Sequence, residues 1–553
     1  MNTTFSGNNP SPSISTPGRE RRGLEAEEAI TLSVTVSISS KQGEEKRGNK
    51  DKTNKIKTSV FFTVSVYCFF VFGQYQRARI SDRILNNMKN TILWYDLETF
   101  GLNPRYDRIA QAAAIRTDMD LNVIDQPLLL YSKLSPDYLP VPESCLVTGI
   151  TPQMVNEMGI RESEMIEKLL SEMMKPGTIT TGFNSIGFDD ECIRSTLYRN
   201  LYDPYEREYS NGCSRWDILN LVRATRDLRP QGMVFDKKNS ETGYTSFKLT
   251  DLTEENGIDQ KGAHDALVDV RATINVARLI KKNQPRLWDW ALNIRDKDNV
   301  KNVVNVLKHE PFLHTSSMFA SEKGNTHPCL PLFYSGKNEI WCFDLSFDIP
   351  SNPELSDYKA TGLFKLNANR CPFVAPLNTL DKEGENRLGF TKEEVLKRAR
   401  YIVDRKVFDK EKLLETIPEF ENTDKDPDVT IYGSFLSRDD KKRLAEVRKL
   451  PPSAKLSHHP SLPFDDEKYH KLVWRQVARN WPEVLSDSDR KKWKNWCASR
   501  LISPPIQNAQ SLENYRANCK KLMESMEIEG EKKKIIASLL EYGDWLEDTV
   551  IKD

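Results

Sequence analysis

The sequence has no excess of either charge, because 80 Lys and Arg residues balance 80 Asp and Glu residues. A formal net charge of zero excludes a uniformly basic protein, so any nucleic-acid-binding surface has to be local. Composition alone therefore neither supports nor excludes DNA as a partner. The nine cysteines contain no C-x-x-C pair, which argues against a disulfide framework and against a structural zinc site. This pattern indicates a reducing cytoplasm.

Long apolar runs are also scarce, and the one that stands out lies near the N-terminus. Residues 1–57 are mostly polar and charged and are expected to be disordered, whereas residues 58–76 carry no charge. The apolar kernel at 60–73 is shorter than the roughly 20 residues that span a bilayer. Two interpretations stay open: a membrane anchor, or a dispensable extension of residues 1–87 with Met88 as the functional start. We expect the second, without stable membrane association.

A chain of 553 residues exceeds a single core, and its patterning indicates three folded regions after the extension. Residues 88–284 alternate strand-like and helix-like segments, which predicts an α/β domain. Residues 285–435 carry short apolar runs, such as 340–345, between Pro, Gly and Asn, and are expected to be mainly β. Residues 436–553 have the periodicity of amphipathic helices. In the first region the predicted strands are 91–97, 108–116 and 178–183, and the predicted helices are 162–174, 190–200, 217–225 and 266–280.

The strongest chemical signal is a pair of carboxylates at the end of the first predicted strand. Asp96 and Glu98 are two residues apart, so on a strand both side chains project from the same face. Two carboxylates held together repel each other unless a cation neutralises them, and hard oxygen ligands suit Mg²⁺ or Mn²⁺. Taken alone, the pair is explained equally well by an exposed strand face.

Two later segments supply the other residues that a metal-dependent site needs. Asp189 follows the strand 178–183 and opens a helix; the alternative role is a helix N-cap, which Asp190 beside it could fill instead. His264 stands just before the helix 266–280, and Asp269 lies in the first turns of that helix. His264 is the only one of seven histidines before residue 309, so it is the single candidate for a catalytic histidine in the first half. In isolation it would be interpreted as a surface histidine.

Together these residues follow the order D-x-E, D, H-x4-D and resemble the DEDDh exonuclease superfamily. The tyrosine-bearing branch has Tyr four residues before the last Asp, where this chain has Asp265, so the histidine branch fits. The resemblance implies two-metal hydrolysis at phosphorus, with His264 as general base toward the attacking water. The ligands that it implies for two Mg²⁺ ions, with Mn²⁺ as a substitute, are Asp96, Glu98, Asp189 and Asp269.

The resemblance to the superfamily implies that the segment just after the first two carboxylates meets the terminal nucleotide. The ring of Phe100 could stack on any base, although core packing is the alternative for Phe100 and Leu102. Arg215 and Lys248 are weaker candidates, because an ion pair or a helix cap explains them nearly as well. The predicted substrate-binding residues are Glu98, Thr99, Phe100, Leu102, Arg215 and Lys248.

The catalytic pattern does not choose a substrate, because proofreading subunits, oligoribonucleases and repair nucleases all share it. Further motifs are spread over residues 90–550: TGITP at 148–152, YRNLYDPY at 198–205, SRWD at 214–217, NGI at 256–258, QPRL at 284–287, GNT at 324–326, RCP at 370–372, APLNTL at 375–380 and ARNWP at 478–482. In these motifs the chain resembles bacterial exonuclease I. That family implies an α/β RNase H-like exonuclease domain, an SH3-like β-rich domain and a C-terminal helical domain, which fit 88–284, 285–435 and 436–553. Residues 1–87 have no counterpart in it.

The resemblance to exonuclease I implies a processive 3′→5′ exonuclease that degrades single-stranded DNA to 5′-mononucleotides in DNA repair and recombination. It further implies a monomeric, cytoplasmic enzyme whose partner is the acidic C-terminal tail of single-stranded DNA-binding protein. Two alternatives stay open: an RNA-trimming or proofreading DEDDh nuclease, and a catalytically silent DNA-binding or scaffold protein with the same fold. The intact set of carboxylates and histidine disfavours the silent protein.

Overall fold

The computed structural model describes residues 90–552 except 261, 263, 350–357, 417–425, 435, 505, 507–508 and 526–528. The predicted extension 1–87, its apolar stretch 58–76 and the expected start at Met88 lie outside the described residues. The described residues belong to one compact unit. Among the helices that the structure describes, none combines the length and the apolar character needed to cross a membrane.

A five-stranded mixed sheet lies at the centre of the first region. Its strands are β1 (Thr91–Thr99), β2 (Ile109–Thr117), β3 (Leu128–Tyr131), β4 (Thr178–Gly182) and β5 (Ser214–Asp217). Their order is β3-β2-β1-β4-β5, with β1 antiparallel to β2 and parallel to β4. The three predicted strands are β1, β2 and β4. The two edge strands were not predicted, because four residues are too few to show an alternating pattern.

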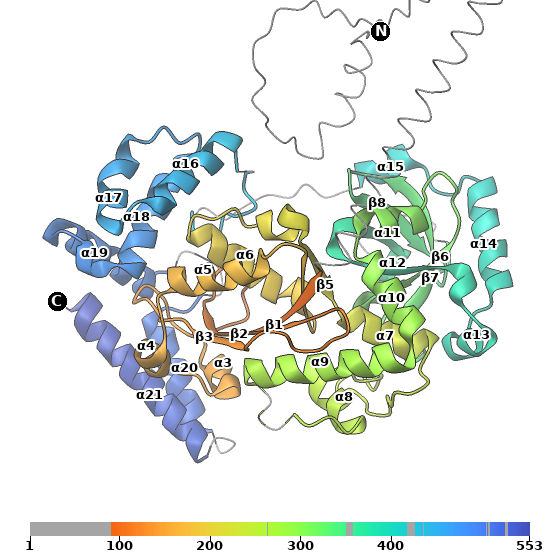
Figure 1. Ribbon diagram of the computed structural model, residues 1–553, viewed down its shortest axis with the longest axis horizontal. Coiled ribbons are helices and arrows are strands. Elements are labelled where there is room, and N and C mark those ends of the chain that lie inside the picture. The colour runs from red at the N-terminus through yellow and green to blue at the C-terminus, as the bar shows by residue number, and fades with distance from the viewer. Residues whose placement is uncertain are drawn as a thin grey trace, which may run out of the picture. The chain divides into compact units, whose positions relative to one another are not determined.

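Helices cover both faces of this sheet, and the alternation along β1 decides which residues face which helices. The helices are α3 (Pro142–Thr148), α4 (Pro152–Met158), α5 (Glu162–Met173), α6 (Asp189–Arg199), α7 (Leu219–Leu228), α8 (Leu249–Glu255) and α9 (Ala266–Asn283). Leu93 and Tyr95 pack with residues of α5 and α6, whereas Ile92 and Trp94 pack with residues of α7 and α9. Figure 1 shows α5 and α6 above the sheet and α9 below it. Asp96 continues the even-numbered series and therefore projects toward α9.

A second five-stranded sheet, antiparallel throughout, forms the β-rich part of the chain. Its strands are β6 (Phe312–Thr315), β7 (Thr326–Tyr334), β8 (Glu339–Asp344), β9 (Leu363–Asn367) and β10 (Phe373–Pro376), in the order β10-β6-β7-β8-β9. The helices around it are α10 (Pro285–Ile294), α11 (Lys297–Val303), α12 (Tyr358–Thr361), α13 (Lys382–Leu388), α14 (Lys392–Asp404) and α15 (Lys410–Glu415). The region is therefore more helical than its short apolar runs predict.

The two sheets share one continuous apolar core. Trp216 of β5 and Trp288 of α10 meet edge to face, with 5.1 Å between their ring centroids, and both are buried. The same cluster of buried side chains continues to Phe343 of β8 and Val395 of α14. Helix α10 thus begins at Pro285, where the sequence suggested a boundary, but it completes the core of the preceding α/β region.

The last region is helical from Ser437 onward, as its amphipathic pattern predicts. Its helices are α16 (Arg438–Lys449), α17 (Pro452–His458), α18 (Lys468–Asn480), α19 (Asp487–Ile502), α20 (Leu512–Glu524) and α21 (Glu531–Leu546), followed by a π-helical turn at Glu547–Ile551. Arg479 of α18 donates to Asp137 at 2.9 Å and also binds Asp428. This buried ion pair ties the helical region to the α/β region.

Candidate active site

Five residues that the sequence singled out line one cleft of about 850 Å³. Asp96 and Glu98 come from β1, Asp189 is the first residue of α6, Asp269 lies in the first turn of α9, and His264 precedes α9. Ligand oxygens of Asp96, Glu98 and Asp269 all lie within 4.8 Å of one another. The parallel strands β1 and β4 have their carboxyl ends at the same edge of the sheet, which is where α/β folds usually bind ligands.

Asp189 and Asp190 are separated by their surroundings, although they are adjacent in the sequence. Asp190 is buried against Arg207 at 2.6 Å and Arg215 at 3.0 Å, and it accepts from the Tyr95 hydroxyl at 2.6 Å. It therefore does not cap α6, contrary to the suggested role, and the N-cap residue Phe188 makes no side-chain cap either. Asp189 is left to face the cleft.

The turn before α9 is built to present His264. Its backbone has φ of 69°, in the left-handed region that non-glycine residues seldom adopt. The following residue, Asp265, caps α9 by accepting from the N–H groups of Leu267 at 3.0 Å and Val268 at 3.3 Å. The buried Gln111 of β2 accepts from the Ala266 N–H at 3.0 Å. These contacts fix the start of α9 against the sheet.

Burial and mutual repulsion dominate the electrostatics of the carboxylates. Burial, followed by the charge of Asp269, raises the pKa of Asp96 to about 8. Burial, Asp96 and Asp269 raise the pKa of Glu98 to about 9, and burial with Asp96 raises the pKa of Asp189. No described Lys or Arg forms an ion pair with these carboxylates.

This donor set fits a divalent cation. Several carboxylates crowded without a basic partner are what a hard cation stabilises, because it neutralises their repulsion and accepts oxygen ligands. Asp96, Glu98 and Asp269 therefore form a cluster that could hold such a cation.

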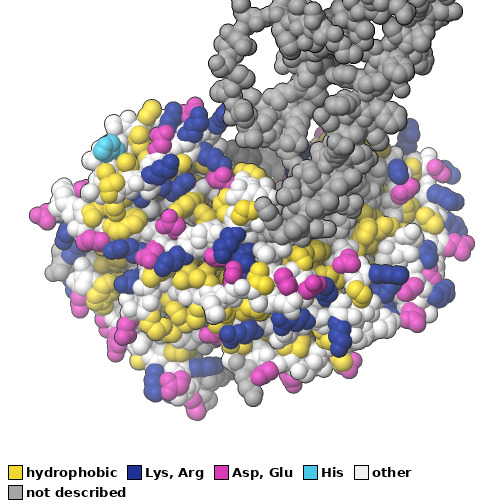
Figure 2. All heavy atoms as spheres, in the orientation of Figure 1, with side chains coloured by type: hydrophobic (Ala, Val, Ile, Leu, Met, Phe, Trp, Pro, Cys, Tyr) yellow, Lys and Arg dark blue, Asp and Glu magenta, His cyan; other side chains and the backbone are white. Residues whose placement is uncertain are grey.

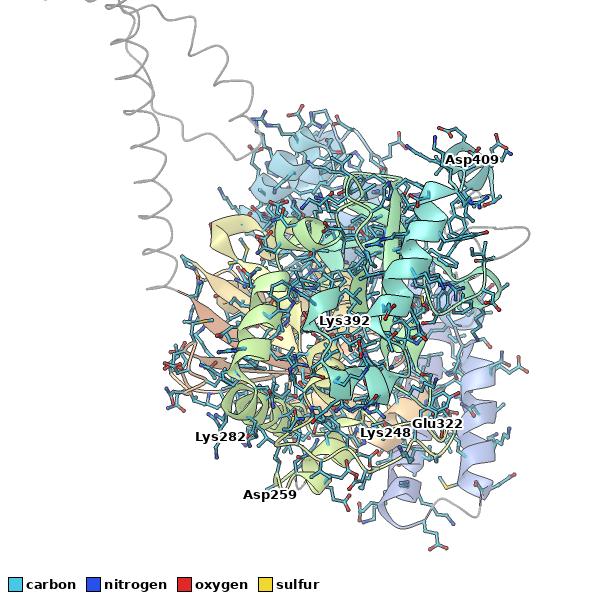
Figure 3. The ribbon with its side chains drawn as sticks, turned by 90° about the vertical axis from the view of Figure 1, so that its right-hand side faces the viewer. Lys248, Asp259, Lys282, Glu322, Lys392 and Asp409 are labelled. Carbon is cyan, nitrogen blue, oxygen red and sulfur yellow. The ribbon has the colours of Figure 1, made fainter. Side chains whose placement is uncertain are left out.

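Two basic side chains also line the cleft. Lys248, labelled in Figure 3, occupies the N-cap position of α8 without making a side-chain cap, so the helix-cap alternative does not apply to it. Arg223 of α7 was not singled out from the sequence. On the face seen in Figure 2, basic and acidic side chains are interspersed, in keeping with the balanced charge.

Two of the predicted substrate contacts are wrong in this structure. Phe100 is 1% exposed and packs against the core that contains Tyr138, so its ring offers no face to a base. Arg215 is 6% exposed and binds Asp190 at 3.0 Å and Glu208 at 3.2 Å. For Phe100 the core-packing alternative holds, and for Arg215 the ion-pair alternative holds.

The remaining two predicted contacts are outside the set of residues that line the cleft. The hydroxyl of the buried Thr99 donates to the Gly101 carbonyl at 2.7 Å. Leu102 is 81% exposed, so the core-packing alternative fails for it, and it stays free to meet a substrate.

Gln260 and Asn184 are among the polar residues of the cleft that sequence reasoning missed. The Gln260 side-chain amide donates to Asp269 Oδ1 at 2.7 Å, while the His264 backbone N–H donates to Asp269 Oδ2 at 3.4 Å. Asn184 has φ of 65° in the turn between β4 and α6. The turn GFNS at 182–185 carries a usable signal for Asn184, because Asn tolerates left-handed backbone; nothing in the sequence marks Gln260.

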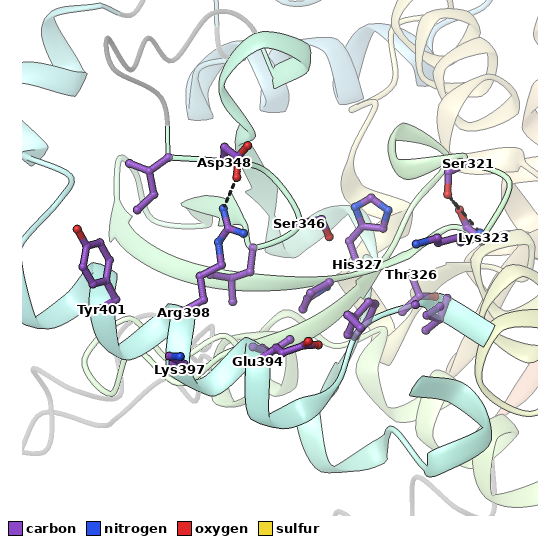
Figure 4. Close-up of a pocket in the computed structure, with 18 residues that line it drawn as sticks. Ser321, Lys323, Thr326, His327, Ser346, Asp348, Glu394, Lys397, Arg398 and Tyr401 are labelled. Atoms are coloured by element: carbon purple, nitrogen blue, oxygen red, sulfur yellow. Dashed lines mark hydrogen bonds and ion pairs between the residues drawn. The ribbon is translucent and has the colours of Figure 1, made fainter. Parts of the chain in front are cut away.

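A second cavity, of about 860 Å³, lies between β7 and α14 (Figure 4). Its lining includes Lys323, His327 and Arg398, and Arg398 is 3.6 Å from Asp348. None of the predicted catalytic residues lines it. Within the described ranges, the carboxylate cluster that could hold a metal is in the first cleft.

Comparisons with known proteins agree with this geometry. Residues 93–277 match the family described as "Exonuclease", residues 295–357 match "Exonuclease I SH3-like domain", and residues 425–546 match "Exonuclease I C-terminal domain". The fold and the first match define the class: the chain is an exonuclease, a hydrolase of phosphodiester bonds.

Relatives that match more than four fifths of the chain narrow the assignment from this class to one family. Exodeoxyribonuclease I of Haemophilus influenzae is 36% identical, over 81% of this chain and 97% of its own length. The corresponding Escherichia coli protein is 33% identical, over 82% of this chain and 98% of its own length. The crystal structure of E. coli exonuclease I with a dA16 oligonucleotide superposes with a TM-score of 0.76, at 33% identity over 83% of this chain and 100% of the other. The chain belongs to the exonuclease I family.

Two further solved structures of this family bear on ligands. One is the zinc-ion-bound form of the E. coli ExoI–ssDNA complex, and the other is SSB/Exonuclease I in complex with an inhibitor. Both are 33% identical to this chain and cover 83% of it and 100% of their own chains, with TM-scores of 0.75 and 0.74.

Proposed function

We propose that the protein degrades single-stranded DNA processively from the 3′ end and releases 5′-mononucleotides, in DNA repair and recombination. The observation that carries the proposal is the convergence of Asp96, Glu98, Asp189, His264 and Asp269 on one cleft from separate segments of the chain. Relatives that were crystallised with single-stranded DNA support the substrate class.

The four carboxylates would hold two Mg²⁺ ions, with Mn²⁺ as a substitute. When bound, such a pair supplies electrostatic stabilisation of the attacking and leaving oxygens of an in-line displacement at phosphorus. Crowding of Asp96, Glu98 and Asp269 within 4.8 Å supports a shared site, and their uncompensated charge supports the cation.

The protein side chains then orient the nucleotide and move one proton. His264 is the proposed general base, because it lies at the cleft beside Asp269 and an imidazole suits proton transfer near neutral pH. Lys248 is the proposed contact to a backbone phosphate. Glu98 and Leu102 keep the substrate-binding role that the sequence suggested, with Leu102 exposed beyond the end of β1.

The three-region division of the chain is part of the proposal. Residues 88–284 would carry hydrolysis, 285–435 the SH3-like DNA-binding surface, and 436–553 the helical domain. Deleting residues 1–87 should leave the nuclease rate unchanged; sedimentation of the full chain with membranes, lost on this deletion, would instead establish the anchor.

We also propose a monomer in the cytoplasm that binds the acidic C-terminal tail of single-stranded DNA-binding protein. The eight described cysteines are free thiols, which supports a reducing compartment. The solved SSB/Exonuclease I structure supports the partner. A synthetic peptide with the tail sequence should bind the purified protein, and a peptide with its acidic residues replaced by serine should not. Light scattering measures the molar mass in solution and therefore tests whether the protein is a monomer.

The experiment that tests the proposed activity uses purified protein, Mg²⁺ and end-labelled single-stranded DNA. An RNA strand and a blunt duplex of the same sequence serve as controls. Equal rates on RNA would favour the RNA-trimming alternative, and binding without hydrolysis would favour the silent protein.

A further inference from the structure

A small polar cavity of about 250 Å³ lies between the α/β region and the C-terminal helices, away from the catalytic cleft. One wall is the start of α5 together with residues just after α6, and the other is formed by the α16–α17 junction and the end of α18. Figure 1 shows α5 beside α18, and residues of these helices are in contact. No residue of this cavity lines the catalytic cleft.

Lys455 lines this cavity as a buried cation, and no described carboxylate neutralises its charge. The side chain as a whole is 4% exposed, but its ammonium nitrogen is not fully buried and is reached from the cavity. Among the described residues, no acceptor or carboxylate is paired with this ammonium. Its nearest compensation is the ring of Trp481, 4.8 Å from the ammonium nitrogen to the ring centroid. Lysine is almost never this buried without a paired charge, because burial removes the hydration of the ammonium. Burial, followed by the charge of Arg448, lowers the pKa of Lys455 to about 8.

Two arginines add positive charge around the same cavity. Arg448 stacks its guanidinium on Tyr202 at 4.4 Å and donates to the Leu201 carbonyl. Among the described residues, its guanidinium forms no ion pair with a carboxylate. Arg161 lies 6.0 Å from the Trp481 ring and binds Glu483 at 2.8 Å. Cations next to cations raise the energy of the empty cavity, so the arrangement favours a negatively charged occupant.

The start of α5 contributes in the same direction. Arg161 is its N-cap residue and makes no side-chain cap, and the helix has 12 residues. The positive end of the helix dipole therefore faces the cavity. The first-turn N–H groups already have partners, because Ser163 donates to the Asn480 side chain at 2.9 Å and Glu164 and Met165 donate to the Arg161 carbonyl. Helix α5 thus contributes the field of its dipole rather than free N–H donors. The two acidic residues of the lining weaken this field only in part. Glu164 is paired with Lys168 at 3.2 Å, and Glu167 is exposed.

We propose that this cavity is an oxyanion site that binds a single phosphate group, either as inorganic phosphate or as the phosphate of a nucleoside monophosphate. Lys455 and Arg448 bind the anion from the helical region, and the positive end of the α5 dipole stabilises it from the α/β region. The volume suits a compact group rather than a whole nucleotide, since pockets for drug-sized ligands begin at about 300 Å³. Because it contacts both regions, the bound anion stabilises the interface between them.

The test is calorimetric titration of the full chain with inorganic phosphate in EDTA, against chloride at equal ionic strength, with thermal unfolding in parallel. We expect phosphate but not chloride to bind and to raise the unfolding temperature. Lys455→Met should weaken phosphate binding at least tenfold, and it should unfold no earlier than wild type in chloride because it removes an unpaired buried charge. Lys449→Met is the matched control on the exposed neighbouring surface.

A second variant and a second ligand complete the experiment. If Lys455→Met does not fold, Arg448→Gln should show the same loss of phosphate binding. Deoxyadenosine monophosphate that competes with phosphate identifies a nucleotide phosphate as the ligand, and failure to compete identifies the free anion. Unchanged phosphate binding in a folded Lys455 or Arg448 variant, or identical behaviour in phosphate and chloride, would mean that ordered water fills the cavity, and the proposal would be wrong.

Discussion

The side-chain amide of Gln260 donates to Asp269 Oδ1 at 2.7 Å, and its own carbonyl accepts from the Thr253 hydroxyl at 2.6 Å. Gln260 therefore holds the carboxylate of Asp269 from outside the cluster while the His264 N–H contacts the other oxygen. In metal sites such outer contacts orient the ligand and tune its affinity.

Replacing Gln260 should weaken metal binding at the site without abolishing it. We expect Gln260→Ala to lower the rate or the metal affinity by about 10- to 100-fold, the usual effect of losing such a contact. Gln260→Glu should be worse, because it adds negative charge and removes the donor. Calorimetric titration with Mg²⁺ measures the affinity directly, and Gln231→Ala is the matched control on the surface. If Gln260→Ala binds Mg²⁺ and turns over as wild type does, the contact has no role.

Loss of the carboxylate of Asp96 or Glu98 should abolish hydrolysis but leave DNA binding largely unchanged. We expect Asp96→Ala and Glu98→Ala to lose nearly all turnover, because the metal loses its ligands, while affinity for single-stranded DNA depends mainly on contacts elsewhere. Fluorescence anisotropy and a mononucleotide-release assay separate the two quantities. Asp120→Ala, at an exposed position, is the control. Substantial turnover in either variant would show that these carboxylates do not hold metal.

His264→Ala should reduce the rate by roughly 10²- to 10⁴-fold, which is what a positioned general base contributes. Metal binding should survive, since histidine is not a ligand in this scheme. Single-turnover kinetics together with Mg²⁺ titration make the distinction, and His458→Ala controls for a surface histidine. Simultaneous loss of metal and activity would reassign His264 as a ligand.

The interface between the α/β and helical regions should weaken in acid. Burial alone would raise the pKa of Asp137, but the guanidinium groups of Arg479, Arg108 and Arg500 lower it to about 2. Because this folded-state pKa lies below the unfolded value of about 3.9, the stabilisation is present above pH 4 and is lost as the pH falls through 2. It amounts to roughly 2 kcal/mol at neutral pH.

The measurement is the unfolding temperature between pH 5 and pH 2, followed by circular dichroism. Asp137→Asn should be less stable at neutral pH, because it leaves buried guanidinium groups uncompensated, and its stability should change less with pH in this window. Asp544→Asn, at an exposed ion pair, should keep the wild-type profile. A wild-type pH profile in Asp137→Asn would mean that another group controls acid unfolding.

Much of the catalytic arrangement could be predicted from the sequence because its signals are local. Asp96 and Glu98 share a face through the two-residue period of a strand, and His264 with Asp269 share the start of one helix. Asp217 shows the limit of such reasoning. It looked like a helix start, yet it ends β5 and accepts from the N–H groups of Asn184 and Leu219.

The predictions for Phe100 and Arg215 were wrong because tertiary contacts decide the roles of these two residues. In the sequence, an aromatic ring beside a predicted metal ligand and the arginine of the SRWD motif both resemble substrate contacts. Burial places Phe100 in the core, and Asp190 with Glu208 neutralises Arg215. Gln260 and Lys455 could not be found at all, because their partners are set by the packing of distant segments rather than by any motif.

Polarity and substrate choice on end-labelled strands test the central claim most directly. Purified protein with Mg²⁺ should release a 3′-terminal label at once as a mononucleotide, whereas a 5′ label should stay in progressively shorter strands until the end. Blunt duplex DNA and RNA of the same sequence should be degraded far more slowly, and EDTA should stop all release. Immediate release of the 5′ label, or equal rates on RNA and DNA, would contradict the account.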